Sequence, residues 1–326
     1  MDSDALNTFL AVYRRGGVSN AAKALHRSQP AISRRIALLE QELGVPLFER
    51  VAGRTRLSDA GRLMVPYAER AVAATLDAFN AVRSLARQIA GPVSLAVVGT
   101  LALGRLSAIL KRFAEDYPDV SLTLRTATSA EIADLIRRGE ATIGLRYQRA
   151  ASPDLDCELL FAEPLQVMCA PGHPLAGRRV ENLADLRHER WIAFPEAPGR
   201  AEIAASHVTA LFTTRGLNDI AWTPVDSLTA QKRLVEAGFG VALLLESHVA
   251  DERRSSAIAT IRVGDLAASH EIVAVTRHGG FLSAASCRLL DIIRAEYKQT
   301  KFAPRGAGGR KPASAQERRI KRRPRG

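Results

Sequence analysis

Short runs of apolar residues at helical spacing open the chain. A first helix is predicted by a stripe at three- and four-residue intervals, Leu6, Phe9, Leu10 and Tyr13. We expect Ser19 to cap a second helix over residues 20–26 and Ser28 to cap a third that begins near Pro30, because a hydroxyl accepts hydrogen bonds from the free N–H groups of a first turn. Short helices joined by tight turns predict a helix-turn-helix.

The third predicted helix has one apolar side and a polar, basic beginning. The apolar side consists of Ile32, Ile36, Leu39 and Leu43. The beginning carries Gln29, Pro30, Ser33 and Arg34. Short polar and basic groups at the start of such a helix suit a reader of the major groove, since glutamine can pair with adenine and arginine with guanine or a phosphate. A charged helix face that is only solvated is the alternative.

A small β-hairpin is predicted after the third helix. Gly44 ends that helix, and residues 45–58 place apolar ends on either side of a Gly-Arg tip at Gly53. This pattern predicts a wing of two strands. The arginines of the wing could reach backbone phosphates or the minor groove, and they are Arg50, Arg54 and Arg56.

A long amphipathic helix is predicted from residue 59 to about residue 90. An approximate heptad seam follows Leu63, Tyr67, Ala71, Ala74, Ala78, Ala81 and Leu85. A second apolar face follows Val65, Val72, Leu76, Phe79 and Val82. We expect the same helix of a second subunit to cover these faces, with packing against its own domain as the alternative. A homodimer also suits DNA binding, because paired reading helices address a two-fold symmetric site.

Alternating strands and helices begin at Gly91-Pro92. Strands are predicted at residues 93–98, 120–125 and 142–147, with helices between them. This order is typical of an open parallel sheet. A second set of strands is predicted at residues 165–170, 191–194, 220–225 and 241–245. The pattern ends with a strand and a helix at residues 271–276 and 281–298.

The net charge of +12 is concentrated at the two ends of the chain. Residues 1–91 carry +5 and residues 301–326 carry +9, whereas residues 92–300 carry −2. Basic ends and a nearly neutral middle suit ends that meet phosphate and a middle with another task. The last segment has no apolar periodicity, so we expect a disordered tail over 299–326 that either solubilises the protein or anchors it nonspecifically to DNA.

Cysteines and histidines are scattered along the chain without motif spacing. The cysteines are Cys157, Cys169 and Cys287, which we expect to be reduced, with a redox switch between the first two as the alternative. The seven histidines make no metal-binding motif, so we expect no metal site and no cofactor.

Other function classes are disfavoured by features that the sequence does not contain. A P-loop and a G-x-S-x-G motif are absent, which argues against the common enzyme classes that use them. No secretory signal and no membrane span are predicted, so we expect a cytoplasmic protein that does not contact the membrane. An exported solute-binding protein, the other alternative, would not carry a helix-turn-helix.

Residues 21–36, with the sequence AAKALHRSQPAISRRI, resemble the LysR-type transcriptional regulators. So do Leu39-Glu40, Leu43-Gly44, residues 47–50 (LFER) and residues 57–61 (LSDAG). The resemblance covers residues 3–298 and implies a DNA-binding regulator, not an enzyme. By matching position it implies that DNA is faced by Ser28, Gln29, Pro30, Ser33 and Arg34, and that Arg54 and Thr55 belong to the wing.

The resemblance also implies a multidomain architecture. An all-α winged helix-turn-helix over residues 1–58 precedes a linker and dimerisation helix over 59–90. An α/β effector domain follows, built of two lobes like a periplasmic binding protein. The first lobe comprises residues 91–164 and 268–298, and the second comprises 165–267. The implied partners are promoter double-stranded DNA, a small-molecule effector, RNA polymerase, and further copies of the chain in a homodimer or homotetramer.

Loops that follow the predicted strands are expected to hold the effector. In open α/β sheets ligands collect at the carboxyl ends of strands, where helix N-termini offer free N–H groups. The expected contact residues are Thr100, Leu101, Thr128, Ser129, Arg146, Phe194, Pro195 and Ser227. Capping of their own helices is the alternative for the hydroxyl groups.

Arg146 leads us to expect an anionic effector, because its guanidinium could pair with a carboxylate. A solvated strand end is the alternative for this residue. The common G-x-x-D pattern of the family appears as Gly139-Glu140-Ala141-Thr142 in this chain, without the final aspartate.

Overall fold

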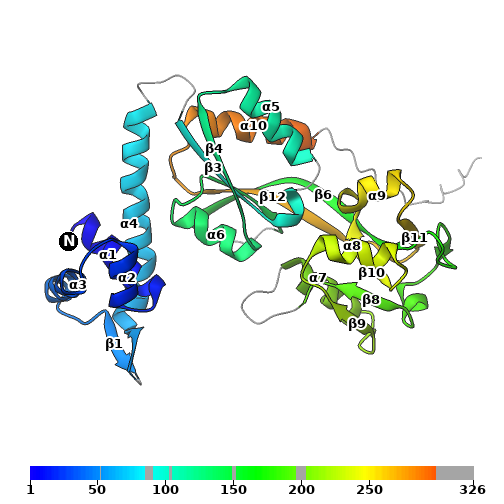
Figure 1. The fold of residues 1–326 in the computed structure, drawn as a ribbon, viewed down its shortest axis with the longest axis horizontal. Coiled ribbons are helices and arrows are strands. Elements are labelled where there is room, and N and C mark those ends of the chain that lie inside the picture. The colour runs from blue at the N-terminus through cyan, green and yellow to red at the C-terminus, as the bar shows by residue number, and fades with distance from the viewer. Residues whose placement is uncertain (52, 85–90, 103–104, 149–151, 196–202, 299–326) are drawn as a thin grey trace, which may run out of the picture.

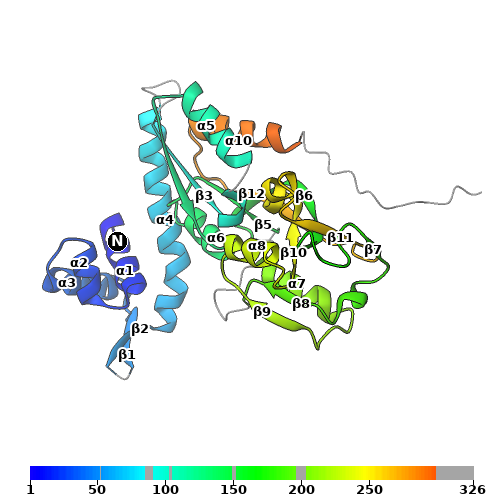
Figure 2. The same ribbon diagram turned by 45° about the vertical axis from the view of Figure 1, so that its right-hand side comes forward.

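The computed structural model describes residues 1–298 except 52, 85–90, 103–104, 149–151 and 196–202. The predicted tail at 299–326 and the predicted end of the linker helix lie outside the described residues. A small helical domain stands on one side of a long helix, and two α/β lobes follow in a row on the other side (Figures 1 and 2).

The N-terminal domain consists of three helices and a hairpin. These are α1 (Ser3–Arg15), α2 (Val18–Ala24), α3 (Gln29–Leu43), β1 (Phe48–Val51) and β2 (Arg54–Leu57). The Ser28 hydroxyl accepts a hydrogen bond from the Ala31 N–H at 3.4 Å, so the predicted cap of α3 is confirmed. The prediction for α2 is wrong, because Gly17 is the N-cap and Ser19 lies within the first turn.

One small core joins the three helices and the hairpin. Phe9, Ile32 and Leu39 are fully or almost fully buried, and the Phe9 ring lies 5.4 Å from that of Phe48. Ala21 of α2 is also fully buried, and its small side chain permits close packing of the helices. The predicted burial is wrong at the last residue of two apolar stripes. Tyr13 of α1 is 44% exposed, and Leu43 of α3 is 38% exposed.

The linker helix α4 (Asp59–Ser84) is a single helix of 26 residues. It packs on α1 through Ala68 and faces the first lobe at Ala73, and both side chains are fully buried. Much of its apolar surface has no cover in the single chain. The exposed large residues are Leu63, Tyr67, Leu76, Phe79 and Val82.

The first lobe contains a five-stranded sheet in the order β4-β3-β5-β12-β6. Its elements are β3 (Gly91–Val97), η1 (Gly99–Ala102), α5 (Arg105–Asp116), β4 (Val120–Thr126), α6 (Ser129–Arg137), β5 (Ile143–Tyr147), β12 (Ser269–Arg277) and α10 (Ala284–Lys298). Strand β3 runs parallel to β4 and β5, which confirms the predicted parallel sheet, and β12 is antiparallel to β5. Helices α5 and α10 cover one face and α6 the other (Figure 1).

The second lobe repeats this plan with shorter strands. Its elements are β7 (Arg179–Val180), η2 (Leu183–Leu186), β8 (Arg190–Ala193), α7 (Ile203–Thr213), β9 (Ala221–Pro224), α8 (Leu228–Glu236), β10 (Val241–Leu245), η3 (Glu246–Val249), α9 (Ala250–Arg254) and β11 (Ala259–Val263). Strand β8 lies between β10 and β9 and is parallel to both.

One strand, β6 (Leu155–Cys169), belongs to both lobes. Residues 155–164 pair with β12 in the first lobe, and residues 165–169 pair with β10 and β11 in the second. The sequence predicted only the second half, because the first half carries the charged residues Asp156, Glu158 and Glu163 among its apolar ones. The lobes are therefore joined by continuous backbone as well as by packing.

Candidate functional site

The start of α3 and the wing both present polar side chains to solvent. Seven of the predicted DNA-contacting side chains are exposed there: Ser28, Gln29, Pro30, Ser33, Arg34, Arg50 and Arg54. The eighth, Thr55, is half-buried, and its hydroxyl lies close to Gly17. All of the predicted residues of helix and hairpin except Thr55 are therefore accessible to a partner.

Ion pairing separates two groups of arginines in this domain. Arg27 and Arg35 pair with Asp4 at 2.8 and 2.5 Å, so they hold α1 to the other helices. Arg34, Arg50 and Arg54, in contrast, make no ion pair with any carboxylate in the described part of the chain. Exposed guanidinium groups without a carboxylate partner can neutralise phosphates at little cost, since no internal ion pair has to break.

The wing is fixed to α3 and α4 by hydrogen bonds at its base. The Glu40 carboxylate of α3 accepts the backbone N–H groups of Leu47 and Phe48 at 2.7 and 3.2 Å. The Ser58 hydroxyl donates to the Pro46 carbonyl at 2.6 Å and accepts from the Gly61 N–H at 3.0 Å. These bonds give a physical reason for the motif at residues 57–61.

A cavity of about 450 Å³ lies between the lobes, within the size range of roughly 300–1,000 Å³ typical of small-molecule sites. We call it the effector cleft. Its wall is apolar around Ile192, Val208, Trp222 and Leu243, and polar around Thr100, Thr128, Tyr147, Asp226, Thr229, Gln231, His248 and His270.

Four of the eight predicted effector residues line the cleft. They are Thr100, Thr128, Phe194 and Pro195. The other four, Leu101, Ser129, Arg146 and Ser227, are not among the lining residues. Leu101 and Ser129 are buried, and the Ser227 hydroxyl caps α8 by accepting from the Ala230 N–H at 3.4 Å.

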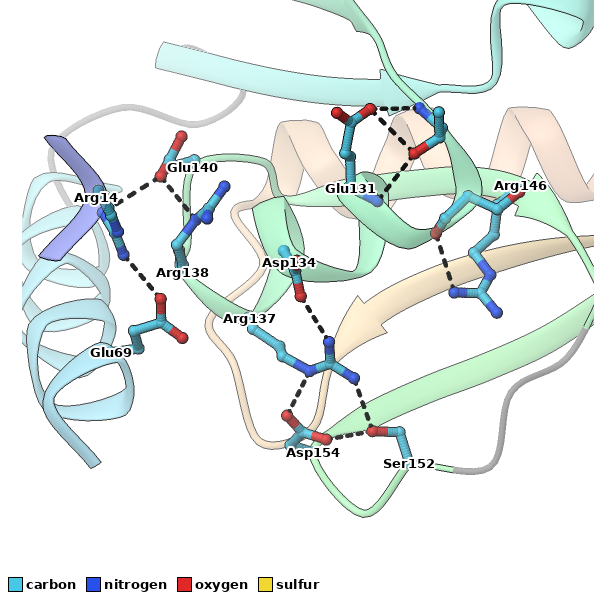
Figure 3. Close-up of polar contacts among 12 residues, drawn as sticks. Arg14, Glu69, Glu131, Asp134, Arg137, Arg138, Glu140, Arg146, Ser152 and Asp154 are labelled. Atoms are coloured by element: carbon cyan, nitrogen blue, oxygen red, sulfur yellow. Dashed lines mark hydrogen bonds and ion pairs between the residues drawn. The ribbon is translucent and has the colours of Figure 1, made fainter. Parts of the chain in front are cut away.

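Arg146 is bound internally and does not face the cleft. Its guanidinium donates to the Ser129 carbonyl at 3.1 Å (Figure 3). It also donates to the Gln148 carbonyl at 3.2 and 3.3 Å. The residue is only 2% exposed, and burial lowers the pKa of the guanidinium. The alternative of a solvated strand end is wrong, because the side chain is buried. Three of its five N–H donors are already used by backbone carbonyls, and the pairing with a carboxylate stays a prediction.

The N-terminus of α6 is capped in part by the carboxylate of Glu131, a residue of the same helix. The Thr128 hydroxyl accepts from the Glu131 N–H at 3.3 Å, and Glu131 accepts from the Thr128 N–H at 2.9 Å. This is a capping box, which uses two N–H groups of the first turn. The capping alternative for Thr128 therefore holds alongside its position on the cleft wall.

Three histidines from distant parts of the second half converge beside the cleft, which the sequence did not indicate. The rings of His207 and His270 lie 5.0 Å apart, and that of His270 lies 5.3 Å from Tyr147. His248 is hydrogen-bonded through Nε2 to the Tyr147 hydroxyl at 3.1 Å. Residues so far apart in the chain produce no motif.

Burial keeps two of these histidines neutral. Burial lowers the pKa of His248 to about 3, assisted by His270 and Lys232, and lowers that of His270 to about 4, assisted by His207. No cluster of ligands that could hold a metal ion occurs among the described residues. Burial also raises the pKa of the Cys169 thiol to about 11, which makes it a poor redox centre at neutral pH.

Comparisons with known proteins decide the family. The model of the bacterial regulatory helix-turn-helix protein, lysR family, matches residues 3–62, and that of the LysR substrate binding domain matches residues 86–298. The chain belongs to the LysR family of transcription regulators. It is therefore a DNA-binding regulator with a domain for small-molecule effectors, and its relatives are regulators, not enzymes.

Several curated LysR-type regulators are similar over most of their length. The transcriptional dual regulator GltC of Bacillus subtilis is 31% identical over 77% of this chain and 83% of its own. The regulator SsuR of Burkholderia cenocepacia is 29% identical over 90% of this chain and 94% of its own.

Solved full-length LysR-type regulators share the fold. CbnR is 27% identical, with a TM-score of 0.60 over 91% of this chain and 99% of its own, and CbnR in complex with its target DNA gives 0.59. A full-length OxyR variant from Pseudomonas aeruginosa, 20% identical, gives a TM-score of 0.66 over 96% of this chain and 99% of its own. No helix in the described part of this LysR-type regulator is long and apolar enough to cross a bilayer.

Proposed function

We propose that this LysR-type regulator contacts the bases of promoter DNA with the start of α3 and the DNA phosphate backbone with its wing. The observations that carry the proposal are the exposure of Gln29, Ser33 and Arg34 at the start of α3, and of Arg50 and Arg54 on the wing, where none of the three arginines has a carboxylate partner among the described residues. In this assignment Gln29 and Arg34 contact base edges, Ser28, Pro30 and Ser33 fit the groove, and the wing residues, Thr55 included, contact phosphates.

We propose a homodimer through α4 as the DNA-binding unit. The five large apolar side chains that α4 leaves exposed support this assignment, because a free apolar surface of this kind is covered in a stable protein. A tetramer of two such dimers, contact with RNA polymerase at the promoter and a cytoplasmic location complete the proposal. Their support is the family alone.

We propose that a small-molecule effector, not a resident cofactor, binds in the effector cleft. Support comes from the size of the cavity and from its position between two lobes that share strand β6. The expected anionic character has little support here, because the Arg146 guanidinium is bound to two backbone carbonyls. An anion would have mainly N–H groups at helix starts to pair with.

The DNA assignment is tested by selecting bound sequences from a randomised duplex pool with purified protein. Gln29→Ala should broaden the selected base pattern, since each bidentate base contact is worth about 1–3 kcal/mol of discrimination. Arg54→Ala should weaken binding to every sequence by a similar factor and reduce the salt dependence.

Arg112→Ala is the matched control, because Arg112 is an exposed arginine on α5 in the first lobe. An unchanged base pattern in Gln29→Ala would remove the assignment of α3. Equal losses in Arg54→Ala and Arg112→Ala would remove that of the wing.

A further inference from the structure

A row of hydrogen-bonded side chains spans the effector cleft. The Thr100 hydroxyl is 2.7 Å from the Tyr147 hydroxyl, which is 3.1 Å from Nε2 of His248. Thr100 and Tyr147 belong to the first lobe, and His248 belongs to η3 of the second. All three line the cavity, so a bound molecule meets this row directly.

The groups in this row carry no charge at neutral pH. Tyr147 is 2% exposed and hydrogen-bonded, and the buried imidazoles of His248 and His270 are neutral for the reasons given above. Nδ1 of each of these two histidines is buried and has no hydrogen-bond partner among the residues that the structure describes. The polar side of the cleft therefore offers hydroxyl and neutral imidazole groups, which recognise a ligand by hydrogen bonds alone.

The described residues that line the cleft carry a net negative formal charge. Asp226, exposed beside the start of α8, contributes a carboxylate to the lining. The guanidinium of Arg146 donates to internal carbonyls, and the N–H groups of Thr128 and Glu131 at the start of α6 are used within its capping box. An anion in this cavity would lose its hydration and face a carboxylate.

The rest of the cleft lining is largely aromatic and aliphatic. Phe194 and Trp222 line it together with Ile192 and leucines of β10. The Trp222 ring is held by Phe212, 5.0 Å away, and Trp191, 6.3 Å away. An apolar lining combined with a row of neutral donors and acceptors suits a molecule with an apolar body and one polar end.

We infer that the effector of this regulator is an uncharged, largely apolar molecule that hydrogen-bonds to the Thr100–Tyr147–His248 row. The inference rests on the proposed function, because it assumes that the cleft is the effector site. It adds the chemical class of the effector and names Tyr147 and His248 as the residues that select it. Because the row joins the two lobes, such a ligand would also contact both lobes at once.

The test is a binding screen of the full-length protein with small aromatic compounds in three sets that are uncharged, anionic and cationic at neutral pH. Benzamide, benzoate and benzylamine exemplify the three sets. Ligand-observed NMR detects binding. A crystal structure of the complex locates the bound compound, and competition with a compound located in this way shows whether the others bind at the same site. We expect the compounds that bind to be uncharged ones. Tyr147→Phe should lower their affinity about 5- to 10-fold, as expected for one lost hydrogen bond.

Two further variants keep the result interpretable. Tyr117→Phe removes a hydroxyl that is bonded to Arg288 outside the cleft, and it should leave binding unchanged. Asp226→Asn removes the carboxylate from the cleft lining. It should raise the affinity of anionic compounds and leave the affinity of uncharged ones essentially unchanged.

Each outcome separates the inference from the proposed function. Anionic compounds that bind in the cleft more tightly than uncharged ones, or uncharged compounds that bind equally well to Tyr147→Phe, would overturn the inference and keep the cleft as a ligand site. Compounds of all sets that bind only outside the cleft, or not at all, would overturn the proposed site as well.

Discussion

At the scale of single residues, Gly61 explains why the chain passes so closely from the wing into α4. A Cβ atom at this position would lie 2.1 Å from the Leu47 carbonyl oxygen and 2.9 Å from a methyl group of Leu57. Backbone cannot yield as a flexible side chain does, so only glycine fits without movement of the wing.

We expect Gly61→Ala to destabilise the N-terminal domain by about 1–3 kcal/mol, the usual cost of overpacking. The shift of the hairpin should also weaken DNA binding. Thermal unfolding followed by circular dichroism and a DNA-binding titration measure the two effects. Gly172→Ala is the control, since a Cβ there meets no atom within 4 Å. Similar unfolding temperatures for both variants would contradict this account of the motif.

The buried histidines make the second half of the protein sensitive to acid. The unfolded chain takes up protons at the ordinary histidine pKa of about 6.5, whereas folded His248 and His270 take them up only near 3 and 4. The free energy of unfolding should therefore be highest above a pH of about 6.5 and fall as the pH drops towards about 4, by at most about 1.4 kcal/mol per pH unit for each histidine.

Urea unfolding followed by tryptophan fluorescence at neutral and at mildly acidic pH measures this loss, since Trp191 and Trp222 both lie in the second lobe. His270→Gln should reduce the difference between the two conditions. His278→Gln, which changes an exposed histidine near Asp156, should not. An equal difference in wild type and His270→Gln would rule out His270 as a source.

At the scale of elements, α4 has one side fixed by the chain and one side left open. Ala68 and Ala73 are buried within the chain, while Leu63, Tyr67 and Phe79 are more than half exposed. The arginines beside the open side stack on it, with Arg70 over Tyr67 at 4.6 Å and Arg83 over Phe79 at 4.3 Å.

We expect Leu63→Glu to shift the protein from dimer towards monomer, because burial of a carboxylate in an apolar interface is costly. Sedimentation velocity over a range of concentrations measures the change, and DNA affinity should fall with it. Leu38→Glu, an exposed leucine of α3, is the control. Dimers of equal stability in both variants would show that another surface joins the subunits.

Strong periodicity made most helices and strands predictable, and its limits explain the misses. The stripe of α3 and the apolar runs of β3 and β10 stand out because burial is regular along them, and α4 stands out because its apolar residues recur at helical spacing even where the single chain leaves them exposed. The first half of β6 was missed because charged residues interrupt its pattern. Arg146 was misjudged and the histidines overlooked because both depend on which distant backbone and rings the fold places beside them.

At the scale of the whole molecule, ion pairs hold the first lobe against the DNA-reading half. Arg14 of α1 pairs with Glu69 of α4 at 3.0 Å and with Glu140 of the first lobe at 3.5 Å (Figure 3). Further along α4, the Asp77 carboxylate accepts from the Arg277 guanidinium and from the Phe281 N–H. Helix α6 ends just before Glu140, and its N-cap Thr128 lines the effector cleft. The helix therefore connects the Arg14–Glu140 ion pair with the cleft.

We expect Asp77→Asn to loosen this contact, because the asparagine keeps an acceptor but loses the charge that faces Arg277. The radius of gyration from X-ray scattering should rise, and added salt should change it less than in the wild type. Asp59→Asn is the control, since Asp59 pairs with Arg62 on its own helix. Identical scattering from Asp77→Asn and wild type would show that other contacts hold the lobe.

The shared strand β6 and its neighbour β12 have a consequence for how the protein is made. Strand β12 lies between β5 and β6 inside the first sheet, yet it follows the whole second lobe in the chain. During synthesis the second lobe can therefore complete its sheet while the first still has a gap with two open strand edges. A chain that stops at residue 268 should emerge from the ribosome with that gap permanent, and we expect it to aggregate.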